Sequence, residues 1–253
     1  MNEHILYSAD SGIARLTFHR PDKKNAITAA MYAALAECVQ IAAADESVRV
    51  IVISGSPGVF TAGNDLEDFL HRPPQGNDSP VLQFMRALRD MPKPVIASVD
   101  GIAIGIGTTL LMHCDLVYAS EQARFAMPFT QLGLCAEFAS SLLLPQLAGY
   151  HRAAEMLLTG EPFTIDVAVQ IGLVNRQLAS QQLDDFVNSQ AAKLAALPAD
   201  SLRTTKRLMK SAQRSTIDVV MQEELVEFMR LLSGPDAKEA FEAFAQKRKP
   251  QFR

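Results

Sequence analysis

The chain has 253 residues, 48% hydrophobic and 21% charged, a composition typical of a folded protein with a sizeable buried core. The formal net charge of -4 gives no overall attraction to nucleic acid, and the longest apolar runs, such as residues 142–144, are too short to span a membrane. Three cysteines without CxxC spacing argue against a disulfide framework or a zinc site.

Neither end of the sequence shows a recognisable targeting signal. The first ten residues lack the basic and apolar regions of a secretory signal, and the last residues are not a peroxisomal SKL signal. We therefore expect a cytoplasmic protein. Basic residues cluster at Lys23–Lys24 and at 247–249; each cluster is either a solvated surface or a site for a phosphate-bearing ligand.

Strands and helices alternate through the first two thirds of the sequence. "GIARLTFHR" (residues 12–20) has the period of two of a strand, and Thr28 is placed to cap a following helix. "VRVIVISG" (48–55) is a β-branched run, typical of a strand buried on both faces. Helices over 81–91 and from Gly105 then alternate with strands over 94–101 and 116–120. This order predicts βαβ units and an α/β fold.

Two other stretches differ from this pattern. "HRPPQGNDSP" (71–80) is predicted to be a mobile surface loop beside a site. After Leu178 no strand is predicted, and helices are expected over residues 181–197, 199–212, 217–232 and 236–246. We expect this helical part to pack on the α/β core or on a neighbouring subunit.

Common catalytic motifs are absent from the sequence. "GIGTTL" (105–110) lacks the third glycine of a dinucleotide-binding motif, and no GxxxxGK[ST], HExxH or GxSxG is present. The five histidines have no metal-ligand spacing, and His113 beside Cys114 is interpreted as a packed helix residue. No metal site and no separate cofactor are predicted.

Two strand-to-helix corners, residues 59–69 and 100–111, are rich in small residues. Backbone N–H groups at the start of a helix lack intrahelical partners. If the N–H groups of Ala62 and Ile106 converge on one oxygen, they would stabilise the negative charge of an enolate. The alternative is that both corners are ordinary glycine-rich loops.

Glu137 is the one carboxylate in the otherwise apolar or small run "GLCAEFASSLLLP" (133–145). Burial would raise the pKa of this carboxyl group and make it a stronger base than in water. Alternatively, Glu137 is an acid at a helix start that interacts with free N–H groups.

Several separated motifs resemble the crotonase (enoyl-CoA hydratase/isomerase) superfamily over nearly the whole chain. "FTAGNDL" (60–66) is similar to its F-x-A-G-x-D-[IL] segment, and the stretch 92–134 is similar to its second oxyanion loop and the strands that follow. The resemblance implies a spiral of repeated ββα units over residues 1–196 and a helical trimerisation region over 197–253. It also implies a homotrimer or dimer of trimers, and acyl-CoA thioester substrates that bring CoA with them.

By position, Ala62 and Ile106 match the two oxyanion donors of that superfamily. Lys247 matches a basic residue that reaches the CoA phosphate of a neighbouring subunit. The substrate-binding residues implied in this way are Lys24, Asn25, Ala26, Ile27, Gly63, Asn64, Asp65, Leu66, Gly105, Pro128, Leu134 and Lys247.

The resemblance also bears on the reaction. Hydratases of the superfamily use two glutamates, and this chain has Thr109 and Phe129 at those positions, so efficient hydration should be lost. Glu137 lies where the peroxisomal type of Δ3,Δ2-enoyl-CoA isomerase has its catalytic glutamate, after "PF-x-x-LG". A double-bond shift needs one proton removed and one returned on the same face, so a single carboxylate can serve.

Some features leave alternatives open. Phe138 stands where similar isomerases have glycine, which leaves the acyl chain length undecided. Leu134, Cys135 and Phe138 are either walls of an acyl pocket or plain core. A hydratase in which Glu137 alone activates water and a non-catalytic acyl-CoA binder are the competing hypotheses. Ring-opening isomerases and dehalogenases of aromatic thioesters usually have aspartate at this position.

Overall fold

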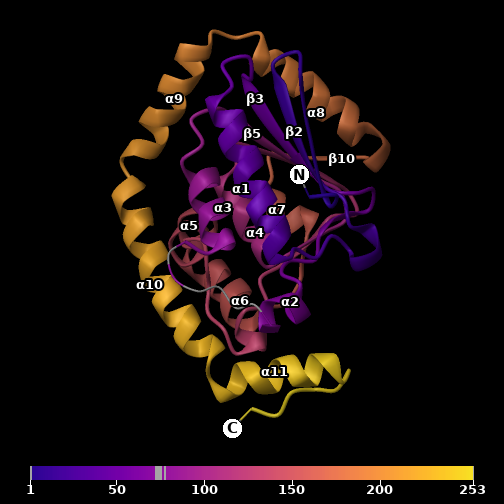
Figure 1. Cartoon of the computed structure of the whole chain (residues 1–253), viewed down its shortest axis with the longest axis vertical. Helices are drawn as coiled ribbons and strands as arrows, with labels where there is room; N and C mark the ends of the chain where they lie inside the picture. The colour runs from indigo at the N-terminus through magenta and orange to yellow at the C-terminus, as the bar shows by residue number, and fades with distance from the viewer. Residues whose placement is uncertain (1, 72–75, 77, 253) are drawn as a thin grey trace.

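Figure 1 shows the computed structural model of the chain, which describes residues 2–71, 76 and 78–252. Half of the loop predicted over residues 71–80, namely 72–75 and 77, lies outside these described residues.

A six-stranded sheet forms the centre of the molecule. Its spatial order is β1 (Ile5–Asp10), β2 (Ile13–Phe18), β3 (Val50–Ser54), β5 (Val95–Val99), β7 (Leu116–Ser120) and β10 (Arg176–Leu178). Only the β1–β2 pair is antiparallel. Four consecutive residues of β3 are buried, which confirms the strand predicted to be covered on both faces.

A second, four-stranded sheet lies beside the first. It contains β4 (Val59–Thr61), β6 (Ile102–Ile104), β8 (Arg124–Ala126) and β9 (Phe163–Thr164), in that order. Three successive strand pairs, β3–β4, β5–β6 and β7–β8, each give their first strand to the large sheet and their second to the small one. This repetition produces the spiral of ββ units that the resemblance implies.

Helices cover both faces of the large sheet (Figure 1). On one face, α1 (Ala29–Ala44) and α3 (Pro80–Arg89) share a core with β3. On the other, α8 (Ser180–Ala195) packs Leu183 and Val187 against Val52. Thr28 caps α1 as predicted, because its side chain accepts a hydrogen bond from the Met31 N–H at 3.3 Å.

The helix predicted from Gly105 does begin there, but α4 (Ile106–Thr109) is one turn long and continues as the 3-10 helix η2 (Leu110–His113). Helix α2 (Leu66–His71) and three helices after residue 139 were not predicted from the sequence. These three are α5 (Ser140–Ala148), α6 (Tyr150–Thr159) and α7 (Ile165–Gln170).

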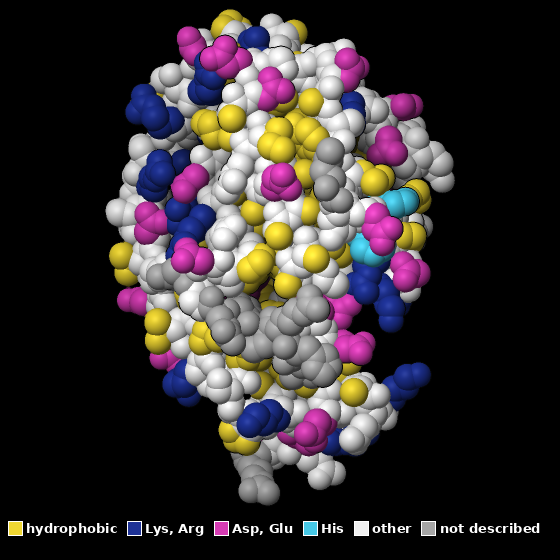
Figure 2. All heavy atoms as spheres, in the orientation of Figure 1, with side chains coloured by type: hydrophobic (Ala, Val, Ile, Leu, Met, Phe, Trp, Pro, Cys, Tyr) yellow, Lys and Arg dark blue, Asp and Glu magenta, His cyan; other side chains and the backbone are white. Residues whose placement is uncertain are grey.

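The C-terminal helices α9 (Ala199–Ser211), α10 (Arg214–Leu232) and α11 (Pro235–Ala245) form an arm along one flank of the core (Figure 1). Together with α8, they confirm the four helices expected after Leu178. The division at residue 196 falls between α8 and α9 and stays a prediction. Figure 2 shows basic and acidic side chains interspersed along this flank. Within the arm, Arg203 forms an ion pair with Asp200, and Arg230 forms one with Glu227.

Within the described residues, no helix is both long and apolar enough to cross a membrane. In the same part of the chain, no group of three or more His, Cys, Asp or Glu side chains is arranged to hold a metal ion.

Candidate active site

The two corners singled out in the sequence lie side by side at the ends of β4 and β6. These strands are parallel and pair Thr61 with Ala103, and the chain then continues from each strand in the same direction. Gly63 has a φ of +85°, and a Cβ there would lie 2.7 Å from the Ile104 carbonyl oxygen and 3.9 Å from the Gly105 Cα. Glycine is therefore required for this close approach.

Hydrogen bonding shows which N–H groups at these corners are free. The Ala62 N–H donates to the Lys24 carbonyl at 2.9 Å, and the Gly63 N–H donates to the Thr61 hydroxyl at 3.1 Å. Ala62 is thus committed within the fold, and its prediction as an oxyanion donor is wrong. Within the described chain, the N–H groups of Asn64 and Ile106 have no acceptor.

The free donors have a simple structural cause. Asn64 forms an isolated parallel bridge with Ile27, in which the Gly63 carbonyl and the Asp65 N–H make the two bonds to Ile27. In a parallel bridge the central residue directs its own N–H to the opposite side. Ile106 is the first residue of α4, and such an N–H has no partner within its helix.

Glu137 lies in the segment between the 3-10 helix η3 (Thr130–Leu132) and α5. Its Oε1 accepts a hydrogen bond from the Thr109 hydroxyl, and its Oε2 is shielded from solvent without a partner among the described residues. Thr109 is three residues after Ile106 in α4, so the carboxyl group is held against the helix that provides the free Ile106 N–H. Glu137 does not cap α5, which excludes the alternative interpretation of this residue.

Burial raises the pKa of Glu137 from 4.5 to about 8. Loss of solvation is the largest cause, the Thr109 hydrogen bond opposes it, and the charge of Glu224 adds to it. A carboxyl group with such a pKa can both accept and return a proton near neutral pH.

A small cavity of about 40 Å³ lies beside Glu137 and Asn64, with room for water. Asn64, Glu137 and Glu224 are its polar members. Its apolar wall includes Phe69, Met85, Phe138, Met221, Phe228 and Met229.

The three residues considered as walls of an acyl pocket lie in different places. Phe138 lines the cavity, whereas Leu134 and Cys135 do not. Leu134 is buried in the main core instead. Three of the wall residues are methionines. Their unbranched side chains change rotamer readily and can make room for a larger ligand.

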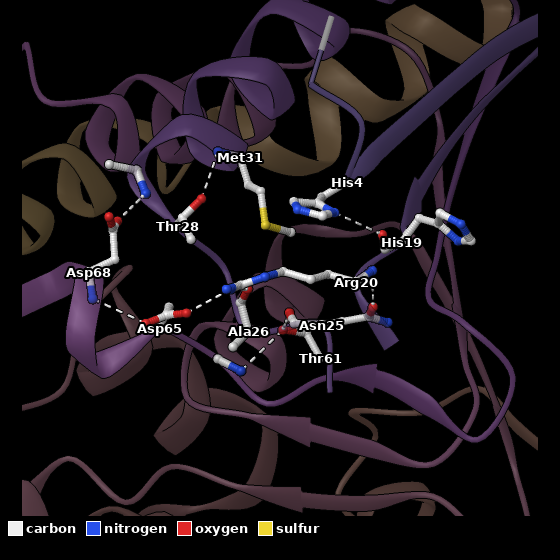
Figure 3. Close-up of polar contacts among 12 residues, drawn as sticks. His4, His19, Arg20, Asn25, Ala26, Thr28, Met31, Thr61, Asp65 and Asp68 are labelled. Atoms are coloured by element: carbon white, nitrogen blue, oxygen red, sulfur yellow. Dashed lines mark hydrogen bonds and ion pairs between the residues drawn. The ribbon is translucent and has the colours of Figure 1, made fainter. Parts of the chain in front are cut away.

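The segment predicted to bind CoA lies against the first corner (Figure 3). Arg20 donates to the Ala26 carbonyl at 2.9 Å and forms an ion pair with Asp65 at 2.7 Å, and the Thr61 hydroxyl donates to the Asn25 carbonyl at 2.7 Å. The Asn25 amide is buried and donates to the carbonyls of Val59 and Phe60.

The structure separates the remaining expected binding residues into two groups. The side chains of Asn25 and Asp65 are occupied by bonds within the fold, while those of Lys24 and Lys247 are exposed. Gly105 has a positive φ, which glycine adopts without strain, and its N–H bonds to the Ala126 carbonyl. Pro128 does not line the cavity, and Leu66 begins α2.

Two residues near the site were not predicted to belong to it: Glu224 was not singled out in the sequence, and His113 was interpreted as a packed helix residue. Glu224 follows Met221 by three residues and precedes Phe228 by four, on the buried face of α10. An acid on such an apolar face is a signal that the sequence does contain. His113 is buried as predicted, and its ring stacks on Phe138.

This fold and site define an α/β protein with a buried carboxyl group beside free backbone N–H groups, and comparison with known proteins specifies the family. A family model described as enoyl-CoA hydratase/isomerase matches residues 8–253. The chain belongs to the enoyl-CoA hydratase/isomerase family and has its crotonase fold.

Relatives in this family carry different activities in their names. The chain is 34% identical to 1,2-epoxyphenylacetyl-CoA isomerase of Escherichia coli over 100% of its length and 99% of the relative's. It is also 34% identical to human enoyl-CoA delta isomerase 2, over 88% of this chain but 58% of that longer protein. A probable enoyl-CoA hydratase of Bacillus subtilis is 32% identical, over 98% of both chains.

Solved structures match closely as well. OdaA of Pseudomonas aeruginosa superposes with a TM-score of 0.94 at 44% identity, covering 96% of this chain and 99% of that one. An enoyl-CoA hydratase/isomerase of Pseudoalteromonas atlantica superposes with a TM-score of 0.94 at 35% identity, covering 99% and 100%.

Proposed function

We propose that this protein is a Δ3,Δ2-enoyl-CoA isomerase, which moves the double bond of a 3-enoyl-CoA into conjugation with the thioester. The observation that carries the proposal is a buried carboxyl group, Glu137, with a pKa near 8 and one oxygen free of partners among the described residues, beside two free backbone N–H groups. One proton-transferring group and one oxyanion site are what this reaction needs.

In the proposed mechanism the thioester oxygen accepts hydrogen bonds from the N–H groups of Asn64 and Ile106. The ionised Glu137 removes a proton from the α-carbon, and negative charge moves onto the oxygen as the dienolate forms. The dipole of the one-turn helix α4 adds only a small stabilisation. Glu137 then returns the proton to the γ-carbon, so no water, metal or separate cofactor is consumed.

The experiment is turnover of 3-hexenoyl-CoA, followed by the absorbance of the conjugated 2-enoyl thioester. We expect activity in the wild type and in Glu223→Gln, which changes an exposed neighbour on α10, and a loss of at least about 100-fold in Glu137→Gln. Retention of most turnover by Glu137→Gln would contradict the role of this residue.

The same assay separates the alternatives. Hydration of crotonyl-CoA at a rate comparable to isomerisation would favour a hydratase in which Glu137 activates water. Binding of acyl-CoA without turnover of any enoyl-CoA would favour a non-catalytic binder.

A ring-bearing thioester is a second candidate substrate. It is favoured by the full-length match to 1,2-epoxyphenylacetyl-CoA isomerase, and ring-opening isomerisation is again an isomerisation without redox chemistry. Turnover of such an epoxide in place of 3-hexenoyl-CoA would select it.

We also propose that the protein forms trimers, or dimers of trimers, in the cytoplasm, with Lys24 and Lys247 near the CoA phosphates. Several large apolar side chains on the C-terminal arm are exposed, among them Leu208, Met209, Val226 and Phe244. Other apolar residues of the arm, such as Leu225 and Phe228, pack within the chain. Sedimentation of a stable monomer would contradict the trimer.

A further inference from the structure

Two residues directly after Glu137 have an unfavourable backbone conformation. Phe138 and Ala139 have φ values of 58° and 57°, in the left-handed region that costs roughly 1–2 kcal/mol for each residue other than glycine. Such conformations persist only where surrounding groups enforce them. The groups that enforce this turn therefore also set the position of Glu137.

Glu224 of α10 is the principal group that holds the turn. One carboxylate oxygen accepts a hydrogen bond from the Ala139 N–H at 2.6 Å. The other accepts from the Ser141 N–H at 3.0 Å and from the Ser141 hydroxyl at 2.6 Å. Glu224 is only 8% exposed, and burial raises the pKa of its carboxyl group. The hydrogen bonds from Ser141 and Ala139 oppose this shift, because all three partners are donors and favour the ionised carboxylate.

His113 contacts the same turn through Phe138. Its Nε2 lies 2.7 Å from the Phe138 carbonyl, and its ring stacks on the Phe138 ring with centroids 3.7 Å apart. Burial lowers the pKa of His113 to about 3, so the ring is neutral, and the carbonyl acceptor assigns the proton to Nε2.

We propose that Glu224 is a positioning residue for the reaction: its carboxylate fixes the turn at Phe138–Ala139 and thereby directs Glu137 into the cavity. Glu224 lines that cavity as well, but its oxygens are already engaged by three donors, so it acts through Glu137 and not on the substrate. This inference rests on the proposed function for its catalytic consequence, although not for the existence of the clamp.

Three polar groups lie around Glu137 on the elements packed against it. Glu224 faces it from α10, and the buried Tyr32 hydroxyl of α1 is close enough for its pKa to be raised partly by Glu137. The Thr109 hydroxyl of α4 is the remaining polar contact. Loosening the turn would admit water to Glu137 and lower its pKa toward 4.5.

The test uses three variants of the full chain. Glu224→Gln removes the charge and places an amide where donors require an acceptor. Ser141→Ala keeps the charge and removes one of its three bonds. Glu223→Gln changes the adjacent exposed residue and is the control.

The first measurement is amide hydrogen exchange, which needs no activity. In Glu224→Gln we expect about 10-fold or more faster exchange in the peptide over residues 134–144, a smaller increase in Ser141→Ala, and unchanged exchange in β5. Exchange in Glu224→Gln equal to that of the control, or faster throughout the protein, would overturn the clamp.

The second measurement is turnover of the enoyl-CoA substrate. We expect kcat to fall about 10- to 100-fold in Glu224→Gln and a few-fold in Ser141→Ala, with KM changed less than about threefold in both. An unchanged kcat in Glu224→Gln despite local loosening would overturn the positioning role. If the wild type turns over no thioester, the isomerase proposal fails, while hydrogen exchange and the ¹³C titration midpoint of the Glu137 carboxyl still decide whether Glu224 positions that residue.

Discussion

Replacing the proposed base by its uncharged analogue, Glu137→Gln, should make the folded protein more stable while it removes activity. The pKa of Glu137 is about 8 in the folded protein, against 4.5 ordinarily. Between these values the folded state keeps a proton that the unfolded state has released. The stability of the wild type therefore falls as pH rises from 4.5 to 8, whereas glutamine does not titrate.

The size of the effect follows from the pKa difference. At about 1.4 kcal/mol per unit, holding the proton at pH 7 costs the wild type up to about 3 kcal/mol relative to the variant. The difference should grow to about 4–5 kcal/mol above pH 8 and vanish near pH 4.5. The Oε2 atom has no partner among the described residues, so the new amide nitrogen breaks no hydrogen bond.

The assay is urea unfolding of both proteins at equal protomer concentration from pH 5 to 8. Glu223→Gln serves as a control whose difference from the wild type should not change with pH over this range. A constant difference between Glu137→Gln and the wild type across the same range would refute the reasoning, because it would mean that Glu137 is ionised in both the folded and unfolded states.

Three further outcomes are expected. The kcat/KM of the wild type should rise with pH and reach half its maximum near pH 8, since only about one Glu137 in ten is ionised at pH 7; a flat profile from pH 6 to 9 would contradict this. Thr109→Val removes a hydrogen bond that lowers the pKa of Glu137, so the same rise should move to higher pH; an unmoved midpoint would contradict that bond. Gly63→Ala places a methyl group 2.7 Å from the Ile104 carbonyl oxygen. It should abolish turnover and lower the free energy of unfolding in urea by more than about 2 kcal/mol. The control Gly58→Ala, with open space at its Cβ, should lower that free energy by only about 1–2 kcal/mol.

Much of the fold could be predicted because its signals are local. The β-branched run around Val50–Ile53 indicates a strand whichever residues surround it, and Thr28 is a typical helix cap. Helix α4 was predicted too long because its continuation as a 3-10 helix is set by packing around Leu110 and Leu111, both buried. The start of α5 depends on tertiary contacts, including the hydrogen bonds that the Ala139 and Ser141 N–H groups donate to Glu224.

In the candidate site, too, the residue with a local sequence signal could be predicted and the residue set by tertiary pairing could not. Glu137 could be found because an acid in an apolar run is conspicuous. The donor beside it could not be read from residue types, because every residue except proline has an N–H. Whether Ala62 or Asn64 has the free one depends on which residue pairs with Ile27 and Lys24, and these lie nearly forty residues earlier in the sequence.

Helix α10 takes part in two structures that are usually built from separate elements. Met221 and Met229 form part of the wall that an acyl chain would contact, and Glu224 lies between them on the same helix. An acyl chain long enough to push this wall outward would also displace the Glu224 carboxylate, which aligns the proposed base Glu137. The length of the acyl chain would then affect the rate of proton transfer as well as binding. A thioester with too long an acyl chain would bind but be converted slowly.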